Sequence, residues 1–230
     1  MCKIHGVNLG NWLVLEKWMH PALFEGVAAE DETDLCRLLP RDELEARLKK
    51  HRDTYITLED FKWIKAHGLN TVRIPVPHFI FGDDPAFCDP YVPCIEYLDK
   101  AFDWAEETGL QILIDLHTAP DSQNGFDNGG ICGVCKFWQK PENEARVIKV
   151  LGMLSERYAH RPALFGVQIL NEPISPELWQ HTVNRYLPSD PEYAAGSGPV
   201  PFEFLCSFYK KAYFEIRKYL DEDKVVMFHD

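Results

Sequence analysis

The second half of the chain reads Gly166-Val167-Gln168-Ile169-Leu170-Asn171-Glu172-Pro173, an apolar run that ends in an amide, a carboxylate and a proline. A run of this length between turn residues is typical of a strand buried on both faces, and Pro173 ends it because proline has no backbone donor for a sheet. The pattern places Asn171 and Glu172 at the carboxyl end of a strand. It predicts that Glu172 is a general acid, and the alternative is that Glu172 only caps or solvates a loop.

Other apolar runs have the same form. Three earlier ones, Ile4–Leu9, Thr71–Val76 and Gln111–His117, each finish at or near a polar side chain, and Lys224–Asp230 is predicted to be a fifth strand. Because the carboxyl ends of parallel strands meet at one edge of a sheet, these polar side chains are expected to lie together.

Helical segments alternate with these strands. The predicted helices are Thr57–Gly68, Ile95–Thr108, Pro141–Tyr158 and Phe202–Leu220. Thr57 to Asp60 has the form of a capping box, and Gly68 and Gly109 are typical of helix ends. Strict alternation of strand and helix predicts an α/β fold with a parallel sheet, and the segment Leu187–Pro201 is expected to be a long loop.

Composition is that of a globular protein, with 46% hydrophobic and 26% charged residues. The net charge of −12 comes from 36 acidic against 24 basic residues. An acidic chain repels phosphate groups, so neither nucleic acid nor an anionic membrane is expected as a partner. No apolar stretch reaches the roughly 18 residues of a membrane span.

The seven cysteines are an odd number, and the first predicted strand begins almost at the first residue, which leaves no room for a signal peptide. Reduced thiols in a cytoplasmic protein are therefore expected. Cys132 and Cys135 have the spacing of a zinc or redox pair, but no second ligand pair accompanies them. They are predicted to be an ordinary loop pair, and neither a metal nor a cofactor is expected.

The ordered motifs point to a family. Asn171-Glu172-Pro173, with Thr71-Val72-Arg73-Ile74-Pro75 and Asp115-Leu116-His117 upstream, resembles glycoside hydrolase family 5 of the retaining β-glycosidase clan. The blocks 6–16 (Gly-Val-Asn-Leu-Gly-Asn-Trp-Leu-Val-Leu-Glu) and 122–128 (Ser-Gln-Asn-Gly-Phe-Asp-Asn) are similar to its exo-β-1,3-glucanase, or glucan 1,3-β-glucosidase, branch. The resemblance covers nearly the whole chain.

The resemblance implies a TIM (β/α)8 barrel, of which residues 1–230 would hold strands 1–5 with their helices in one catalytic-type domain truncated at its C-terminus. It also implies a β-glucan or β-glucoside oligosaccharide as the substrate. In this family Glu172 would be the acid/base, Asn171 would bind the sugar 2-hydroxyl, and Arg73 would hold the nucleophile ionised. The alternative for Arg73 is a structural ion pair at the barrel rim.

The resemblance implies four further substrate contacts. His117 would donate to a sugar hydroxyl, and a hydrogen-bonded core histidine is the alternative. Glu16 would form hydrogen bonds with the hydroxyls of the terminal glucose, and the alternative is a loop glutamate that is only solvated. Phe126 would stack on a sugar at the pocket entrance, with Asn128 as a polar contact beside it.

The nucleophile of this family follows a seventh strand, so it is expected to lie beyond residue 230, and none of the acids in 174–230 has the context of a strand end. Two functions of different classes remain open. One is the amino-terminal part of a retaining β-glucosidase or exo-β-1,3-glucanase, and the other is a non-catalytic or vestigial carbohydrate-binding protein. A barrel enzyme of unrelated chemistry is disfavoured because no phosphate loop, Schiff-base lysine or metal-ligand cluster is visible.

Overall fold

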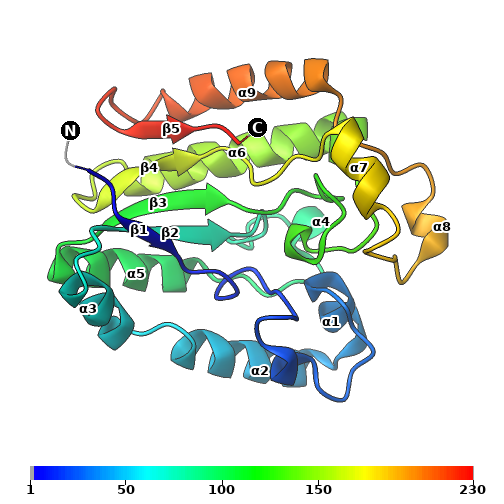
Figure 1. Cartoon of the computed structure of the whole chain (residues 1–230), viewed down its shortest axis with the longest axis horizontal. Coiled ribbons are helices and arrows are strands. Elements are labelled where there is room, and N and C mark those ends of the chain that lie inside the picture. The colour runs from blue at the N-terminus through cyan, green and yellow to red at the C-terminus, as the bar shows by residue number, and fades with distance from the viewer. Residues whose placement is uncertain (1–2, 230) are drawn as a thin grey trace.

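The computed structural model describes residues 3–229 and contains a parallel sheet of five strands. The strands are β1 (Gly6–Asn8), β2 (Thr71–Val76), β3 (Gln111–Leu116), β4 (Leu164–Gln168) and β5 (Val225–Met227). They lie side by side in chain order, and all four neighbouring pairs are parallel (Figure 1). The predicted parallel α/β sheet is confirmed, and β1 and β5 are the edges of the described sheet.

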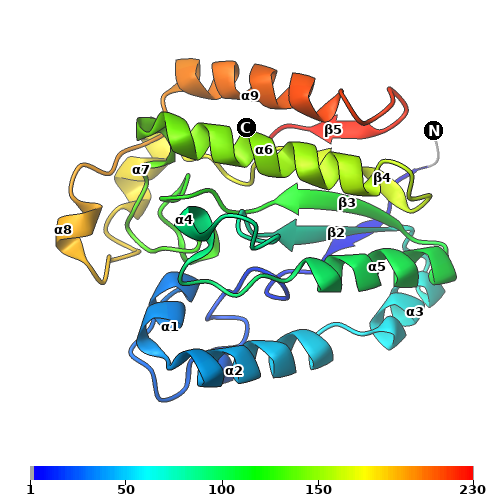
Figure 2. The same cartoon turned by 180° about the vertical axis from the view of Figure 1, so that it is seen from behind.

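Helices fill the connections between the strands. The α-helices are α1 (Glu32–Leu38), α2 (Arg41–Thr54), α3 (Leu58–Ala66), α4 (Pro85–Cys88), α5 (Ile95–Thr108), α6 (Pro141–Tyr158), α7 (Pro176–Thr182), α8 (Pro191–Ala194) and α9 (Phe202–Ile216). Three short 3-10 helices are η1 (Pro21–Phe24), η2 (Asp127–Gly129) and η3 (Phe137–Gln139). Figures 1 and 2 together show α5 and α6 on the same face of the sheet, where α3 packs against α5 and α6 against α9.

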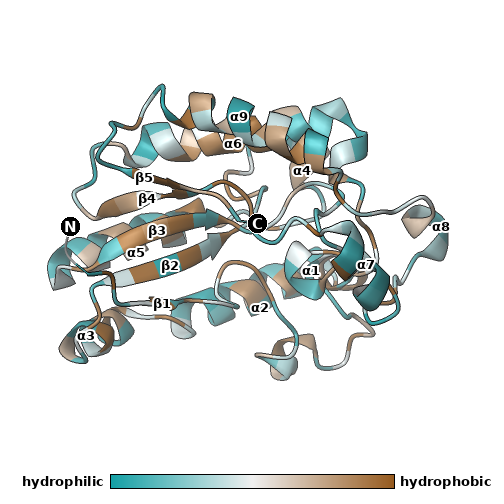
Figure 3. Ribbon diagram, turned by 45° about the horizontal axis from the view of Figure 1, so that its top comes forward, coloured by the Kyte–Doolittle hydropathy of each residue, from teal (hydrophilic) through white to brown (hydrophobic). Residues whose placement is uncertain are grey.

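The strands carry the apolar core. Figure 3 shows hydrophobic residues concentrated along the central strands, and most side chains of β2, β3 and β4 are buried. Gly166 allows β4 and β5 to approach each other, because a Cβ at this position would lie 2.2 Å from the carbonyl oxygen of Val225. The register that pairs Gly166 with Val225 therefore depends on glycine.

The long helices agree with the sequence predictions. The predicted bounds of α5 and α6 are confirmed, and Gly109 ends α5 with φ of 69°, a left-handed conformation that favours glycine. Thr57 and Asp60 form the predicted capping box of α3. The fourth predicted helix was too long, because α9 ends at Ile216 rather than at Leu220.

Four predicted strands were also too long, and Gln111–His117 is the least affected, since β3 ends one residue earlier at Leu116. The structure shortens Ile4–Leu9 to β1 and Lys224–Asp230 to β5, and Asp230 lies outside the described residues. β4 ends at Gln168, but sheet-like hydrogen bonds continue beyond it. The backbone N–H of Ile169 donates to Met227, and that of Asn171 donates to Leu116. The chain thus stays tied to both neighbouring strands as far as the residue before Glu172.

Several helices were not predicted. α1 and α2 were missed entirely, and the predicted loop 187–201 contains α8. α2 lacks a clear apolar stripe, since its apolar buried side chains are Leu44 and Leu48. Its exposed face is stabilised instead by ion pairs one turn apart, including Arg41 with Glu45 and Lys49 with Asp53. No helix among residues 3–229 is long and apolar enough to cross a membrane.

A second, smaller apolar core lies beneath α1 and α2, and α1 also buries carboxyl groups, among them that of Glu32. The Glu32 side chain is fully buried, and its Oε2 accepts a hydrogen bond of 3.1 Å from the backbone of Leu15. Its other oxygen has no hydrogen-bond partner among the described residues. Burial is the main cause that raises the pKa of Glu32, to about 7.

This carboxyl group should make stability depend on pH. Between the ordinary pKa of 4.5 and a folded value of about 7, the folded protein binds more protons than the unfolded chain, so stability falls as pH rises. Because glutamine does not ionise, the unfolding free energy of the wild type should drop relative to that of Glu32→Gln by on the order of 2–3 kcal/mol between about pH 4 and about pH 8. Urea unfolding at both pH values measures this, and parallel pH profiles would contradict it.

Candidate active site

Arg73 lies at the centre of a hydrogen-bonded network at the carboxyl edge of the sheet. Its guanidinium donates to the side-chain oxygens of Asn8 (2.8 Å), Gln168 (3.0 Å) and Asn171 (2.8 Å). It also forms an ion pair of 2.9 Å with Asp115, whose side chain is fully buried. The ion pair considered as the alternative for Arg73 is therefore present, and its action on a nucleophile stays a prediction.

The network fixes the orientation of the Asn171 amide. Arginine only donates hydrogen bonds, so the atom of Asn171 that faces Arg73 is the carbonyl oxygen. The amide nitrogen then points to the other side, where it donates to Glu172 Oε2 at 3.0 Å and approaches His117 Nε2 at 3.4 Å. Asn171 thus presents an N–H donor toward the Glu172 carboxyl group.

His117 is buried, and its Nδ1 contacts the Asp115 carboxylate. A carboxylate only accepts, so Nδ1 carries the proton, and in a neutral ring Nε2 is an acceptor directed at Asn171. The Gln123 side chain donates to the backbone carbonyls of both His117 and Asn171 at 2.8 Å. The predicted contact of His117 with a sugar stays a prediction.

Three hydrogen bonds hold Glu172 in place. Its Oε2 accepts from Asn171 and from Asn128 Nδ2 at 2.9 Å, and its backbone N–H donates to His229 Nδ1 at 3.1 Å. His229 comes directly after β5 and its neighbour Phe228, so it belongs to the same sheet edge. Glu172 has φ of 46°, a left-handed conformation that non-glycine residues rarely adopt and that persists where surrounding contacts fix it.

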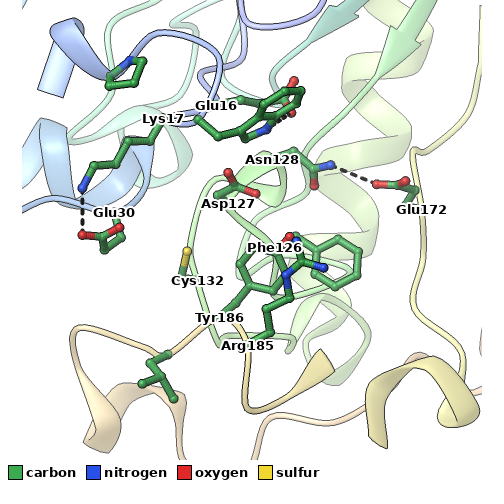
Figure 4. A pocket seen from close by; sticks show the side chains of 13 residues that line it. Glu16, Lys17, Glu30, Phe126, Asp127, Asn128, Cys132, Glu172, Arg185 and Tyr186 are labelled. Carbon is green, nitrogen blue, oxygen red and sulfur yellow. Dashed lines mark hydrogen bonds and ion pairs between the residues drawn. The ribbon is translucent and has the colours of Figure 1, made fainter. Parts of the chain in front are cut away.

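The Glu172 carboxyl group lines an open pocket of about 990 Å³ (Figure 4). Of the predicted site residues, Glu16, Phe126 and Asn128 line the same pocket. The other three, Arg73, His117 and Asn171, form the network beside it and are linked to the pocket through the bond from Asn171 to Glu172. The structure therefore brings all seven predicted site residues to one edge of the sheet.

Glu16 is anchored by two contacts in the loop after β1. Its backbone N–H donates to Asn11 Oδ1 at 2.7 Å, and its Oε2 accepts from Trp18 Nε1 at 3.0 Å. Burial raises the pKa of Glu16, while the nearby His117 and the bond from Trp18 act in the opposite direction. The carboxyl groups of Asp127 and Glu172, which line the same pocket as Glu16, raise this pKa further.

Some residues of the site were missed by the sequence analysis. Asp127 and Gln123 lie inside the quoted block 122–128, and Asp115 and His229 lie in predicted strands, so a signal for each was present. The pocket-lining residues Trp18, Arg185 and Tyr186 had no such signal. They come from loops whose course over the pocket is set by the tertiary structure.

Cys132 and Cys135 agree with the predicted loop pair. Both are buried free thiols, and burial raises the pKa of each, that of Cys135 to about 12. A thiol with a raised pKa stays protonated near neutral pH and is a poor nucleophile and metal ligand. Within residues 3–229, no cluster of three or more histidine, cysteine, aspartate or glutamate side chains could hold a metal ion.

Solved structures share this arrangement of strands and helices. The crystal structure of rutinosidase from Aspergillus niger superimposes with a TM-score of 0.80 over 99% of this chain and 62% of that chain, at 20% sequence identity. A similarity at this identity establishes the fold alone. The five strands and the helices that connect them correspond to part of a (β/α)8 barrel.

Curated relatives are more similar in sequence. A probable glucan 1,3-beta-glucosidase A of Aspergillus niger is 42% identical over 176 residues, which cover 75% of this chain and 42% of that protein. A glucan 1,3-beta-glucosidase of Kluyveromyces lactis is 36% identical over 99% of this chain and 51% of its own length. The chain thus spans about half the length of these relatives.

The family itself is established by a match over most of the chain. The family model described as Cellulase (glycosyl hydrolase family 5) matches residues 45–188. This segment contains β2, β3 and β4 together with Arg73, His117, Asn171 and Glu172. The chain belongs to glycosyl hydrolase family 5.

Proposed function

We propose that the protein of which residues 1–230 form part hydrolyses β-glucosidic bonds with retention of configuration and that Glu172 is its acid/base. The observation that carries the proposal is the position of Glu172. Its carboxyl group lies in the pocket and accepts hydrogen bonds from Asn128 and Asn171, which fix its orientation there. The relatives named glucan 1,3-beta-glucosidase support a β-1,3-glucan or a short β-glucoside as the substrate.

Retention requires two carboxyl groups about 5–5.5 Å apart, one that protonates the leaving oxygen and one that attacks the anomeric carbon. Glu172 supplies the first, and we propose that the nucleophile lies outside residues 1–230. Arg73 reaches Asn171 from within the sheet, so it can orient the pair Asn171 and Glu172 while its charge favours an ionised carboxylate nearby. Because the relatives are about twice as long as this chain, activity and binding are best measured on the full gene product that contains residues 1–230.

The stereochemical course tests the proposal. When the full gene product hydrolyses a β-1,3-glucan, proton NMR recorded before mutarotation should show β-glucose as the first product. Release of α-glucose first would contradict retention. If no β-glucoside is hydrolysed but sugars still bind, the alternative of a non-catalytic carbohydrate-binding protein would replace the proposal.

Glu16 is proposed to hold hydroxyl groups of the terminal sugar. Glu16→Gln should weaken sugar binding by about 1–3 kcal/mol, because a charge-assisted hydrogen bond is lost, and should leave the melting temperature nearly unchanged. Because burial raises the pKa of Glu16, wild-type affinity should also begin to fall at a higher pH than the ordinary pKa of 4.5 would give. Calorimetric titration with glucose at several pH values measures the loss of affinity and its pH dependence, and thermal unfolding measures the melting temperature. Glu203→Gln, at an exposed position on α9, is the control.

A large loss of melting temperature with unchanged affinity would place Glu16 in the scaffold instead. We also propose a cytoplasmic location, from the odd number of cysteines, and no nucleic-acid or membrane partner, from the negative net charge. Fractionation of cells that express the full gene product tests the location.

A further inference from the structure

Glu172 is held by its backbone as well as by its side chain, and the backbone contact comes from a residue that the mechanism proposed above does not use. The N–H of Asn171 still donates to a main-chain carbonyl, that of Leu116 on β3. The next N–H, that of Glu172, donates instead to the imidazole Nδ1 of His229 at 3.1 Å. Within residues 3–229, this nitrogen is the only hydrogen-bond partner of the Glu172 N–H. A side chain thus replaces the sheet at the residue that carries the proposed acid.

This contact matters because of the backbone conformation of Glu172. Its φ of 46° lies in the left-handed region, and such a conformation persists where surrounding contacts fix it. The bond to His229 is the contact made by the N–H of the strained residue itself. Since the direction of a side chain depends on the backbone angles of its residue, loss of this bond would let the carboxyl group of Glu172 move from its place in the pocket.

Two donors converge on Nδ1 of His229, so this atom is an acceptor. The Arg73 Nε donates to Oε1 of Gln168 at 3.0 Å, and the amide nitrogen of Gln168 therefore faces the other way, where it approaches His229 Nδ1 at 3.4 Å. The Glu172 N–H reaches the same atom. Because a ring N–H would meet two other N–H groups there, Nδ1 carries no proton, and a neutral His229 has its proton on Nε2.

The fold also fixes the backbone of His229. The residue follows Phe228, just beyond β5, and the Tyr209 hydroxyl on α9 donates to its carbonyl oxygen. The ring centroids of Tyr209 and Phe228 are 5.1 Å apart, and the ring planes are inclined by 72°. Figures 1 and 2 both show α9 beside β5. The imidazole is therefore held from α9 through its backbone and from Gln168 and Glu172 through Nδ1.

Arg73 connects two supports of Glu172. One support runs through Asn171, whose amide donates to the carboxyl group, and the other runs through Gln168 and His229 to the backbone N–H. We propose that His229 is a positioning residue for the acid/base, whose unprotonated Nδ1 keeps Glu172 in the left-handed conformation that places its carboxyl group in the pocket. The inference rests on the proposed function of Glu172 and assigns to His229 no contact with the substrate.

Exchange of His229 tests this role with two substrates of the full gene product. The ratio kcat/KM reports the formation of the glycosyl-enzyme, for which β-1,3-glucan needs the proton of Glu172 and a nitrophenyl glycoside does not. His229→Ala should lower kcat/KM for the glucan by roughly 10- to 100-fold, because displacement of a catalytic group by about 1 Å costs up to about 100-fold. It should lower kcat/KM for the nitrophenyl glycoside by less than about 3-fold.

Asparagine and glutamine at position 229 form a matched pair. The Oδ1 of asparagine is bonded to Cγ, as Nδ1 of histidine is, so His229→Asn should accept from the Glu172 N–H and keep kcat/KM for the glucan within about 3-fold of the wild type. His229→Gln carries the same amide one methylene further out, so it should lose as much as His229→Ala. A role in packing alone predicts the reverse order, because glutamine is closer to histidine in volume.

The control is His160→Ala, at an exposed position between α6 and β4, which should leave kcat/KM for both substrates unchanged. Equal losses on both substrates, no loss on either, or equal activity of His229→Asn and His229→Gln would refute the positioning role. If Glu172→Ala still distinguishes the two substrates in that case, the proposed function stands. Should His229→Ala fail to fold, the comparison of His229→Asn with His229→Gln decides. If the wild type hydrolyses neither substrate, the proposed function fails and the inference fails with it.

Discussion

Replacement of Glu172 by alanine is expected to slow hydrolysis of β-1,3-glucan by the full gene product by roughly 10²- to 10⁴-fold, the contribution typical of a general acid. The sugar leaving group is a poor one and needs a proton on the glycosidic oxygen. Nitrophenolate leaves without that proton, so a nitrophenyl glycoside should still form the glycosyl-enzyme. The rates of hydrolysis of β-1,3-glucan and of the nitrophenyl glycoside, both at saturating concentration, measure the expected loss and the expected retention of activity.

Azide provides the control for this variant. A small anion can enter the space left by the carboxyl group and attack the glycosyl-enzyme, so added azide should restore turnover of the nitrophenyl glycoside in Glu172→Ala but not affect the wild type. The product should be a β-glycosyl azide. Equal losses on both substrates, with no rescue, would show that Glu172 positions the substrate and is not the acid.

The elements that could be predicted from the sequence are those in which local signals and tertiary packing agree. α5 has an apolar stripe and a glycine at its end, and α6 has a proline in its first turn and an apolar stripe, so their bounds were predicted correctly. α2 is stabilised by charge pairs and by a few buried side chains beneath it, and a search for an apolar stripe does not find such a helix. The strand β5 was predicted too long because an apolar run of residues does not reveal where its pairing with β4 stops.

The residues of the candidate site likewise include some that could be predicted from the sequence and some that could not. Side chains at or just beyond the ends of strands, such as His117 and Glu172, could be placed because parallel strands end at one edge. Tyr186 and Arg185 could not, since their place depends on contacts of 188–193 with α1 and with the loop after β3, both far away in sequence. Asp115 was missed for another reason. A polar residue within an apolar strand is visible in the sequence, but only the structure shows that its carboxylate joins Arg73 to His117.

Residues 1–230 expressed by themselves are expected to give little soluble monomer and no glucosidase turnover, whereas a longer chain that carries further strands after β5 should give both. β1 and β5 are edges of the described sheet, and backbone groups at unpaired edges associate with other chains. Apolar side chains lie exposed at and next to these edges, with Val7 38% and Phe228 48% exposed. Size-exclusion chromatography and a glucosidase assay on both proteins measure the difference.

The absence of turnover has a separate reason from poor solubility, because Glu172 alone cannot both protonate the leaving oxygen and form the glycosyl-enzyme. A soluble and cooperatively melting 230-residue monomer without turnover would refute the expected association and leave the need for a second carboxyl group intact. An active monomer would refute both and would require that second carboxyl group within this chain. Glu16 and Asp127 share the pocket with Glu172, so Glu16→Ala and Asp127→Ala would then identify it, since loss of the nucleophile abolishes turnover even of a nitrophenyl glycoside.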